Sequence, residues 1–304
     1  MRETVLQTKG LTKKYGKFTA LDGADMTVFR EDIYGLIGCN GAGKTTFMKL
    51  VTGLTEASSG EFEIFGKKGL AAERERNRIG CLIENPSFFG NMTGYQNLRY
   101  YCYQKGITDL KQIDEALELV QLTDAKDKKF RKYSLGMKQR LGIAFAMLDA
   151  PDIMILDEPI NGLDPIAISE LRDTFRKLNQ ERGITLIISS HILSELYAVA
   201  NRFLFIDKGR VLREITKQEL DLECSRCLVI KTGDTKRCAT VLEQLGIGDY
   251  KVIDSTEVRV YQEGVSVKEL NKSLIKNDVD IDGISESGVS LEDYFKQLVG
   301  EESK

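Results

Sequence analysis

A glycine-rich segment that follows a short apolar run constrains the fold of this chain more than any other feature. The apolar run covers residues 33–37, and the segment after it fits the pattern G-x-x-x-x-G-K-[ST] at every required position. Apolar residues then recur at helical spacing over residues 47–54, where Gly53 limits the length of the helix. A strand, a glycine loop and a helix in this order predict an α/β domain with a phosphate-binding loop. The loop residues are Gly38, Cys39, Asn40, Gly41, Ala42, Gly43, Lys44, Thr45 and Thr46.

The residue types in this loop suit a nucleotide. Glycines let the backbone curl so that its N–H groups point at phosphate oxygens, and the following helix adds its positive amino end. Lys44 would reach the β and γ phosphates, and the Thr45 hydroxyl would hold Mg²⁺. The motif alone leaves a kinase, a GTPase and a motor ATPase open, but the sequence has no Asn-Lys-x-Asp guanine reader.

Two further apolar runs end in polar residues. Residues 153–156 lead into Asp157 and Glu158, and residues 184–188 lead into Ser189, Ser190 and His191. Runs of this length are typical of parallel strands buried on both faces, and ligands of open α/β sheets gather outside the carboxyl ends of the strands. We therefore expect one shared site, at which Asp157 can hold Mg²⁺ and Glu158 can polarise an attacking water.

The composition limits the class of protein. The chain has 304 residues, with 43 Lys and Arg against 46 Asp and Glu, so its formal net charge is −3. The length suggests two domains, and the slightly acidic balance argues against a sequence-independent nucleic-acid binder. No apolar run approaches the roughly 20 residues that cross a bilayer, and no signal-peptide core follows the first residues. We expect a soluble, cytosolic protein.

The cysteines agree with a reducing compartment. The six thiols are irregularly spaced, unlike a secreted disulfide framework. Cys224 and Cys227 form a Cys-x-x-Cys, but a structural zinc site needs four ligands, and the sequence has no second such pair and a single histidine. We interpret them as ordinary thiols.

The pattern changes after about residue 219. The order of the expected elements is β-α-β-β-α-β, the split βαβ arrangement, followed by a terminal helix. Strands are expected at 228–230, 250–253, 257–261 and 279–284, and helices at 236–245, 266–276 and 291–299. This second domain has no constellation of catalytic residues.

Further motifs, taken in order, resemble those of the ATP-binding cassette (ABC) ATPases. Residues 133–140 look like the family signature that precedes the acidic strand, and residues 161–165 match the loop after the catalytic glutamate. His191 stands at the position of the switch histidine, and Tyr15 matches the aromatic residue that stacks on adenine. The resemblance covers roughly residues 1–218. It implies the α/β fold of a P-loop ABC ATPase domain, with a mixed sheet core, an antiparallel β subdomain and a helical subdomain at about 85–150. The α+β domain at 219–304 would be an accessory.

The resemblance also implies roles for the matching residues. Lys44, Glu158 and His191 would be catalytic, and Thr45, Asp157 and Glu84 would hold Mg²⁺. The segment with Ser134, Gly136, Lys138 and Gln139 would bind the ATP of a partner subunit. The loop with Asn161, Gly162, Leu163 and Asp164 would contact that partner.

Some residues depart from the family pattern. Tyr133, Leu135 and Met137 replace the usual leucine, glycine and glutamine of the signature. Glu84 stands where most relatives have a glutamine that reaches Mg²⁺ and the attacking water. A carboxylate can still coordinate Mg²⁺, but it adds charge and accepts rather than donates hydrogen bonds. Glu84 and the loop after it are similar to the bacitracin and lantibiotic self-protection branch.

The resemblance implies an ATPase subunit, with ATP and Mg²⁺ as cofactors, that drives a separate membrane permease from the cytoplasmic face. The subunit would form a dimer with a second copy of itself or with a related ATPase, and it would not bind nucleic acid. The transporter would export a peptide antibiotic or give immunity to one. One alternative is a non-transport ABC ATPase acting on ribosomes or DNA. Ribosome-acting relatives usually carry two cassettes, whereas this sequence has one phosphate loop. DNA-repair relatives interrupt the cassette with long coiled-coil arms, and the segment between Thr45 and Ser134 is too short to contain them. Another alternative is a regulator or sensor that works through the C-terminal domain.

Overall fold

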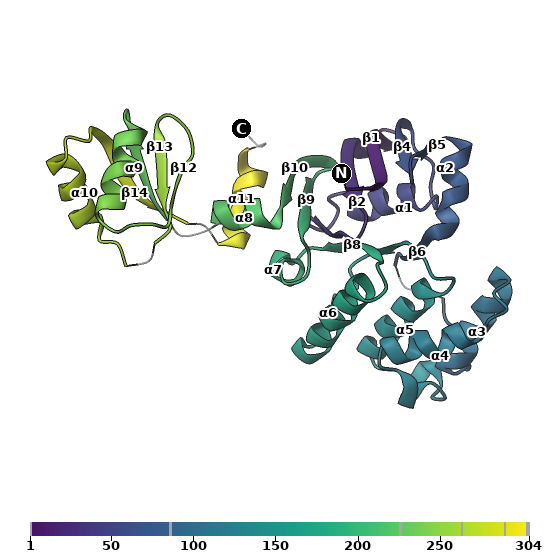
Figure 1. Cartoon of the computed structure of the whole chain (residues 1–304). Helices are drawn as coiled ribbons and strands as arrows, with labels where there is room; N and C mark the ends of the chain where they lie inside the picture. Colours follow the sequence, from purple (N-terminus) through teal and green to yellow (C-terminus); the bar gives the residue numbers. More distant parts are fainter. Residues whose placement is uncertain (1, 85–86, 225–226, 263, 289, 302–304) are drawn as a thin grey trace. The chain divides into compact units, whose positions relative to one another are not determined.

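The computed structural model describes residues 2–84, 87–224, 227–262, 264–288 and 290–301 (Figure 1). The chain divides into two compact units, residues 1–217 and 218–304. Among the described residues, no helix is both long and apolar enough to span a bilayer.

A six-stranded sheet forms the centre of the first unit, with strand order β10-β9-β3-β8-β7-β6. Neighbouring strands from β9 to β6 are parallel, and β10 is an antiparallel edge strand. Every residue of β7 and β8 is buried, as expected for parallel strands covered on both faces. The strands are β3 (Ile33–Ile37), β6 (Ile79–Leu82), β7 (Ile153–Leu156), β8 (Thr185–Ser190), β9 (Arg202–Asp207) and β10 (Arg210–Thr216).

An antiparallel sheet of order β2-β1-β4-β5 completes the β structure of this unit. Its strands are β1 (Thr4–Tyr15), β2 (Phe18–Phe29), β4 (Ser59–Ile64) and β5 (Lys67–Lys68). Alternate residues of β2 face the core, since Ala24, Met26 and Val28 are buried. One hydrophobic core joins residues of both sheets with helix α1 (Lys44–Val51).

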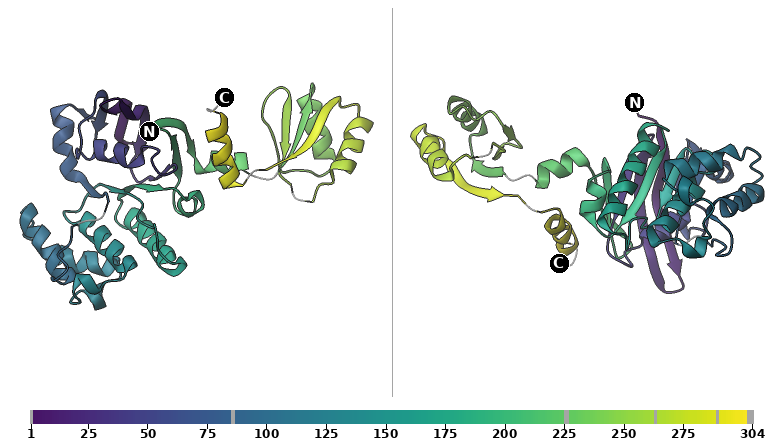
Figure 2. Two further views of the ribbon diagram at one scale, coloured as in Figure 1. Left: turned by 180° about the vertical axis from the view of Figure 1, so that it is seen from behind. Right: turned by 90° about the horizontal axis from the view of Figure 1, so that it is seen from below.

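Helices α3 (Gly94–Lys105), α4 (Lys111–Leu119) and α5 (Leu135–Met147) lie together in both views of Figure 2. Helix α4 has one apolar face, on which Ile113, Ala116 and Leu117 are buried. A capping box of Thr93 and Gln96 fixes the start of α3. The remaining helices of the unit are α2 (Leu70–Glu75), α6 (Pro165–Gln180) and α7 (Leu193–Tyr197), with short 3₁₀ turns at 76–78, 123–125 and 130–132.

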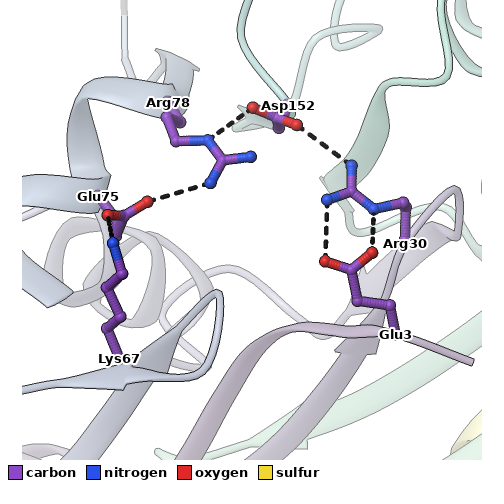
Figure 3. Close-up of polar contacts among 6 residues, drawn as sticks. All are labelled: Glu3, Arg30, Lys67, Glu75, Arg78 and Asp152. Carbon is purple, nitrogen blue, oxygen red and sulfur yellow. Dashed lines mark hydrogen bonds and ion pairs between the residues drawn. The ribbon is translucent and has the colours of Figure 1, made fainter.

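A chain of ion pairs joins separate elements of the first unit (Figure 3). Arg30, between β2 and β3, pairs with Glu3 at 2.6 Å and with Asp152 at 3.1 Å. Arg78, just before β6, pairs with the other oxygen of Asp152 at 2.8 Å and with Glu75 of α2 at 3.1 Å. The antiparallel sheet, α2 and the start of β7 are thus linked through one carboxylate.

The second unit has the β-α-β-β-α-β order expected from the sequence. Its sheet has strand order β12-β13-β11-β14, all antiparallel, with a core formed against α9 and α10. The elements are α8 (Lys217–Cys224), β11 (Cys227–Thr232), α9 (Thr235–Gln244), β12 (Tyr250–Val252), β13 (Glu257–Val260), α10 (Val267–Lys276), β14 (Ile281–Ser287) and α11 (Leu291–Glu301).

Candidate active site

The glycine-rich loop connects β3 to the start of α1. A Cβ atom at Gly38 would lie 2.3 Å from the carbonyl oxygen of Ile206, and Gly43 has φ +109°, so both positions require glycine. The loop lines a pocket of about 280 Å³. The lining residues are Phe18, Ala20, Cys39, Asn40, Gly41, Ala42, Gly43, Lys44, Thr45, Thr46 and Glu158.

The ammonium group of Lys44 is held inside the loop. Lys44 is 5% exposed and donates to the carbonyl oxygens of Gly38 at 2.7 Å and Cys39 at 3.3 Å. Its third contact is an ion pair of 3.1 Å with Glu158 Oε1. Glu158 therefore supplies the negative charge that faces this buried ammonium group.

The acidic pair after β7 meets residues from β8. The other oxygen of Glu158, Oε2, lies 2.8 Å from His191 Nδ1. Glu158 has φ +47°, a left-handed conformation that is uncommon for a non-glycine residue and is typical of functional sites. The structure therefore brings Lys44, Glu158 and His191 together around one carboxylate.

Asp157 is held by two hydroxyl groups. Thr45 Oγ1 donates to Asp157 Oδ2 at 2.7 Å, and Ser189 Oγ donates to Oδ1 at 2.6 Å. Ser189 Oγ also accepts the backbone N–H of Glu158 at 2.8 Å, which fixes the acidic pair against β8. Hydroxyl and carboxylate oxygens are the ligands that Mg²⁺ prefers, so Thr45 and Asp157 fit a magnesium site beside the phosphate loop.

Glu84 lies just beyond the end of β6. It has φ +61°, is 66% exposed and forms a 2.5 Å ion pair with Lys49 of α1. The backbone N–H of Asp157 donates to the carbonyl of Leu82 at 2.8 Å, which keeps this end of β6 beside the Asp157 site. Asn85 and Pro86 of the predicted loop lie outside the described residues.

A second pocket, of about 440 Å³, surrounds the start of α5. Ser134 caps this helix by accepting the N–H of Met137 at 3.3 Å, and Asp164 caps α6 by accepting the N–H groups of Ile166 and Ala167 at 3.0 Å. The lining residues are Ser134, Leu135, Gly136, Met137, Arg140, Gly162, Leu163, Asp164, Ile166, Ala167 and Glu170. The predicted residues Lys138, Gln139 and Asn161 are not among them. No residue lines both pockets, so the signature segment and the phosphate loop form two separate surfaces.

The hairpin between β1 and β2 carries two exposed aromatic rings. Tyr15 is 50% exposed with Lys13 Nζ 4.9 Å above its ring, and it does not line the phosphate-loop pocket. Its cross-strand partner Phe18 does line the pocket and is 64% exposed. Sequence reasoning missed Phe18, although an aromatic residue directly after a Gly-Lys turn was a usable signal. It also left Ser189 and Lys49 without a role.

Comparison with known proteins identifies the family. Residues 21–161 match the ABC transporter family. The chain is 42% identical over 299 residues to the bacitracin transport ATP-binding protein BcrA of Bacillus licheniformis, which covers 98% of both chains. The chain belongs to the ABC transporter ATP-binding proteins. The resemblance and the cassette fold predicted from the motifs are confirmed, and this ABC protein is an ATP-hydrolysing subunit.

Other ABC transporter ATP-binding proteins match this chain over different shares of its length. The ABC ATP-binding protein YcbN of Bacillus subtilis, itself uncharacterized, is 40% identical over 97% of both chains. The lantibiotic transport ATP-binding protein SrtF of Streptococcus pyogenes is 40% identical over 210 residues, 69% of this chain and 90% of its own. The match to BcrA therefore includes most of the second unit, whereas a match of 210 residues cannot cover both units in full.

Solved structures show the same cassette. An ATP-binding subunit of an ABC transporter is 27% identical with a TM-score of 0.62, covering 89% of this chain and 99% of its own. The protein cbiO1 of Clostridium perfringens, part of the transporter complex cbiONQ, is 26% identical with a TM-score of 0.65, covering 80% of this chain and 96% of its own. ATP-binding subunits of this family dimerise and pair with membrane permeases.

Proposed function

We propose that this chain is the ATPase subunit of an exporter of, or immunity system against, a peptide antibiotic of the bacitracin or lantibiotic type. The observation that carries this proposal is the 42% identity with a bacitracin transport ATP-binding protein over 98% of both chains. Glu84 also supports it, because a glutamate at this position, where most cassettes have a glutamine, resembles the bacitracin and lantibiotic branch. The subunit would lie on the cytoplasmic face of the membrane, held there by its permease.

The pocket at the phosphate loop fits MgATP. Lys44 offers a buried cation, the loop admits no Cβ at Gly38, and Thr45 and Asp157 offer oxygen ligands. Mg²⁺ bound there would neutralise charge on the phosphoryl oxygens. Thr45, Asp157 and Glu84 would hold the metal ion. The backbone N–H groups of residues 38–46 would bind the phosphates, and Tyr15 would stack on adenine.

Glu158 would act as the general base. In the structure its two oxygens contact Lys44 and His191 at 3.1 Å and 2.8 Å. Lys44 must leave this carboxylate in order to bind phosphate, and the released Glu158 can then accept a proton from the attacking water. His191 remains beside Glu158 and would contact the γ-phosphate.

The signature surface would complete the site of a second subunit. Ser134 and Gly136 lie at the N-terminus of α5, where free N–H groups and the helix dipole favour an anion. Lys138, Gln139 and the loop from Asn161 to Asp164 would extend this contact to the ATP of the partner. The partner is a second copy of this chain or a related ATPase.

Residues 219–304 would form an accessory domain shared with BcrA. The relatives give no support to the alternative of a non-transport regulator, because they are named as transporter ATP-binding proteins.

Affinity purification of the tagged chain from detergent-solubilised membranes tests the proposal. We expect a polytopic membrane protein to co-purify, and the ATPase rate of the complex to change when bacitracin or a lantibiotic is added. The E158Q variant is the control, since it should recover the same complex without turnover. Recovery of ribosomal or DNA-associated proteins alone would overturn the transport function.

A further inference from the structure

Side chains from two successive turns of α1 contact residues at the ends of two neighbouring strands. Thr45 and Lys49 are four residues apart, so they lie on one face of the helix. Thr45 donates to Asp157 at the end of β7, and Lys49 Nζ lies 2.5 Å from Glu84 Oε1 beyond the end of β6. Lys49 therefore stands one helical turn from the proposed magnesium site.

The backbone holds the end of β6, two residues before Glu84, beside Asp157. Leu82 pairs with Leu156 across β6 and β7, and its carbonyl accepts the N–H of Asp157. Glu84 adopts φ +61°, which an L-residue adopts only when its surroundings hold it there. In this conformation the Glu84 carboxylate forms the ion pair with Lys49.

The pair is too exposed to serve mainly as a stabiliser of the fold. Lys49 is 32% exposed and Glu84 is 66% exposed, and ion pairs in water contribute little to stability. Its charge matters more, because Asp157, Glu158 and Glu84 bring three carboxylates to one edge of the sheet. Lys44 neutralises Glu158, and Lys49 neutralises Glu84. A glutamine at position 84 would not need this lysine.

We propose that Lys49 is a positioning residue that competes with Mg²⁺ for Glu84. In the resting protein Lys49 holds the Glu84 carboxylate at the edge of the site. When MgATP is bound, Glu84 exchanges Lys49 for the metal ion, so each catalytic cycle breaks and remakes the pair. This inference rests on the proposed function, which assigns Glu84 to the magnesium site.

A zero-length carbodiimide cross-link between Lys49 and Glu84 tests the exchange without relying on turnover. The E158Q variant is cross-linked alone, with ATP and EDTA, and with MgATP, and the peptide that joins residues 49 and 84 is quantified by mass spectrometry. We expect the cross-link in the first two samples and a loss of threefold or more with MgATP. A cross-link absent from the nucleotide-free protein, or equal in all three samples, would overturn the proposal.

A double-mutant cycle separates competition for Glu84 from a general effect of charge. Removing the competitor in K49Q should lower the Mg²⁺ concentration for half-maximal ATPase activity threefold to tenfold. In the E84Q background the same substitution should change it less than twofold. K49R should behave like the wild-type protein, and K236Q, which removes an exposed charge from α9 of the second unit, controls for net charge.

Equal shifts in both backgrounds would overturn the inference while leaving the ATPase function intact. The proposed function would be overturned if the wild-type protein showed no ATPase activity, either alone or with its permease. In that case the cross-linking experiment would still test whether MgATP separates Lys49 from Glu84.

Discussion

At the scale of single residues, Glu158 links two other side chains of the site. Its oxygens contact Lys44 and His191, and its left-handed backbone turns the carboxylate toward the loop pocket that it lines. In this arrangement the carboxylate neutralises the lysine that a phosphate group would otherwise meet. If Glu158 is the general base, as we propose, nucleotide binding and release of the base would be coupled through one ion pair.

The E158Q substitution should abolish turnover and preserve ATP-dependent dimerisation. The amide keeps the shape of the side chain but cannot accept the proton of water, and loss of a general base costs about 10²–10⁴ in rate. Phosphate release measures turnover, and light scattering with and without ATP measures the dimer. E181Q, at the end of α6, is the control. A variant that hydrolyses ATP at the native rate would refute the assignment of Glu158.

The cysteines should differ in reactivity because their surroundings differ. Cys39 is exposed in the phosphate-loop pocket, whereas burial raises the pKa of the Cys224 and Cys238 thiols to about 11. The thiolate is the reactive form, so at pH 7 a maleimide should label Cys39 first, and ATP should protect it. Labelling of Cys224 and Cys238 should rise only as the pH approaches 11. Mass spectrometry of tryptic peptides gives the order, and ATP-independent labelling of Cys39 would contradict a nucleotide in this pocket.

At the scale of elements, the sequence predicts local order well. The apolar runs before Asp157 and Ser189 are strands, and the helices expected at 236–245 and 266–276 correspond to α9 and α10. These predictions succeed because they depend on residues that are close along the chain. The pairing of Lys49 with Glu84 joins residues 35 positions apart, and the pairing of Ser189 with Asp157 joins residues 32 apart. Neither follows from spacing, because both depend on how strand ends align with α1.

The two glycine-containing surfaces should respond differently to an added methyl group. At Gly136 a Cβ would meet Ala167 at an ordinary 3.6 Å, so G136A should fold and bind ATP as a monomer. The methyl group would stand where we propose the partner's ATP, so hydrolysis should fall at least about tenfold. At Gly38 the Cβ would lie 2.3 Å from the carbonyl of Ile206, and G38A should lose ATP binding itself. Fluorescent-nucleotide titration and phosphate release separate the two outcomes. Native hydrolysis by G136A would contradict a shared site.

At the scale of the whole molecule, contacts that hold separate elements together were beyond sequence reasoning. Asp152 receives Arg30 from the β2–β3 connection and Arg78 from the segment before β6, on its two carboxylate oxygens (Figure 3). The hydrogen bond from Arg78 lowers the pKa of Asp152 below its ordinary value, and the bond from Arg30 adds to this effect. These three residues come from three distant segments, and none belongs to a motif.

This arrangement predicts a loss of stability in acid that depends on Asp152. A carboxyl group with a lowered folded-state pKa contributes stability above its unfolded pKa of about 3.9 and loses it as the pH falls through the folded value. At pH 7, D152N should lower the free energy of unfolding by about 1–2 kcal/mol. This loss lies between the contributions to stability that are typical of exposed and of buried ion pairs. The difference from the wild-type protein should persist at pH 5 and shrink below about pH 4, as the wild-type carboxyl becomes protonated. Urea midpoints at these pH values measure it, with E61Q, which removes the exposed pair of Glu61 with Lys68, as the control expected to change little. Equal midpoints for D152N and the wild-type protein at pH 7 would show that the network does not stabilise the fold.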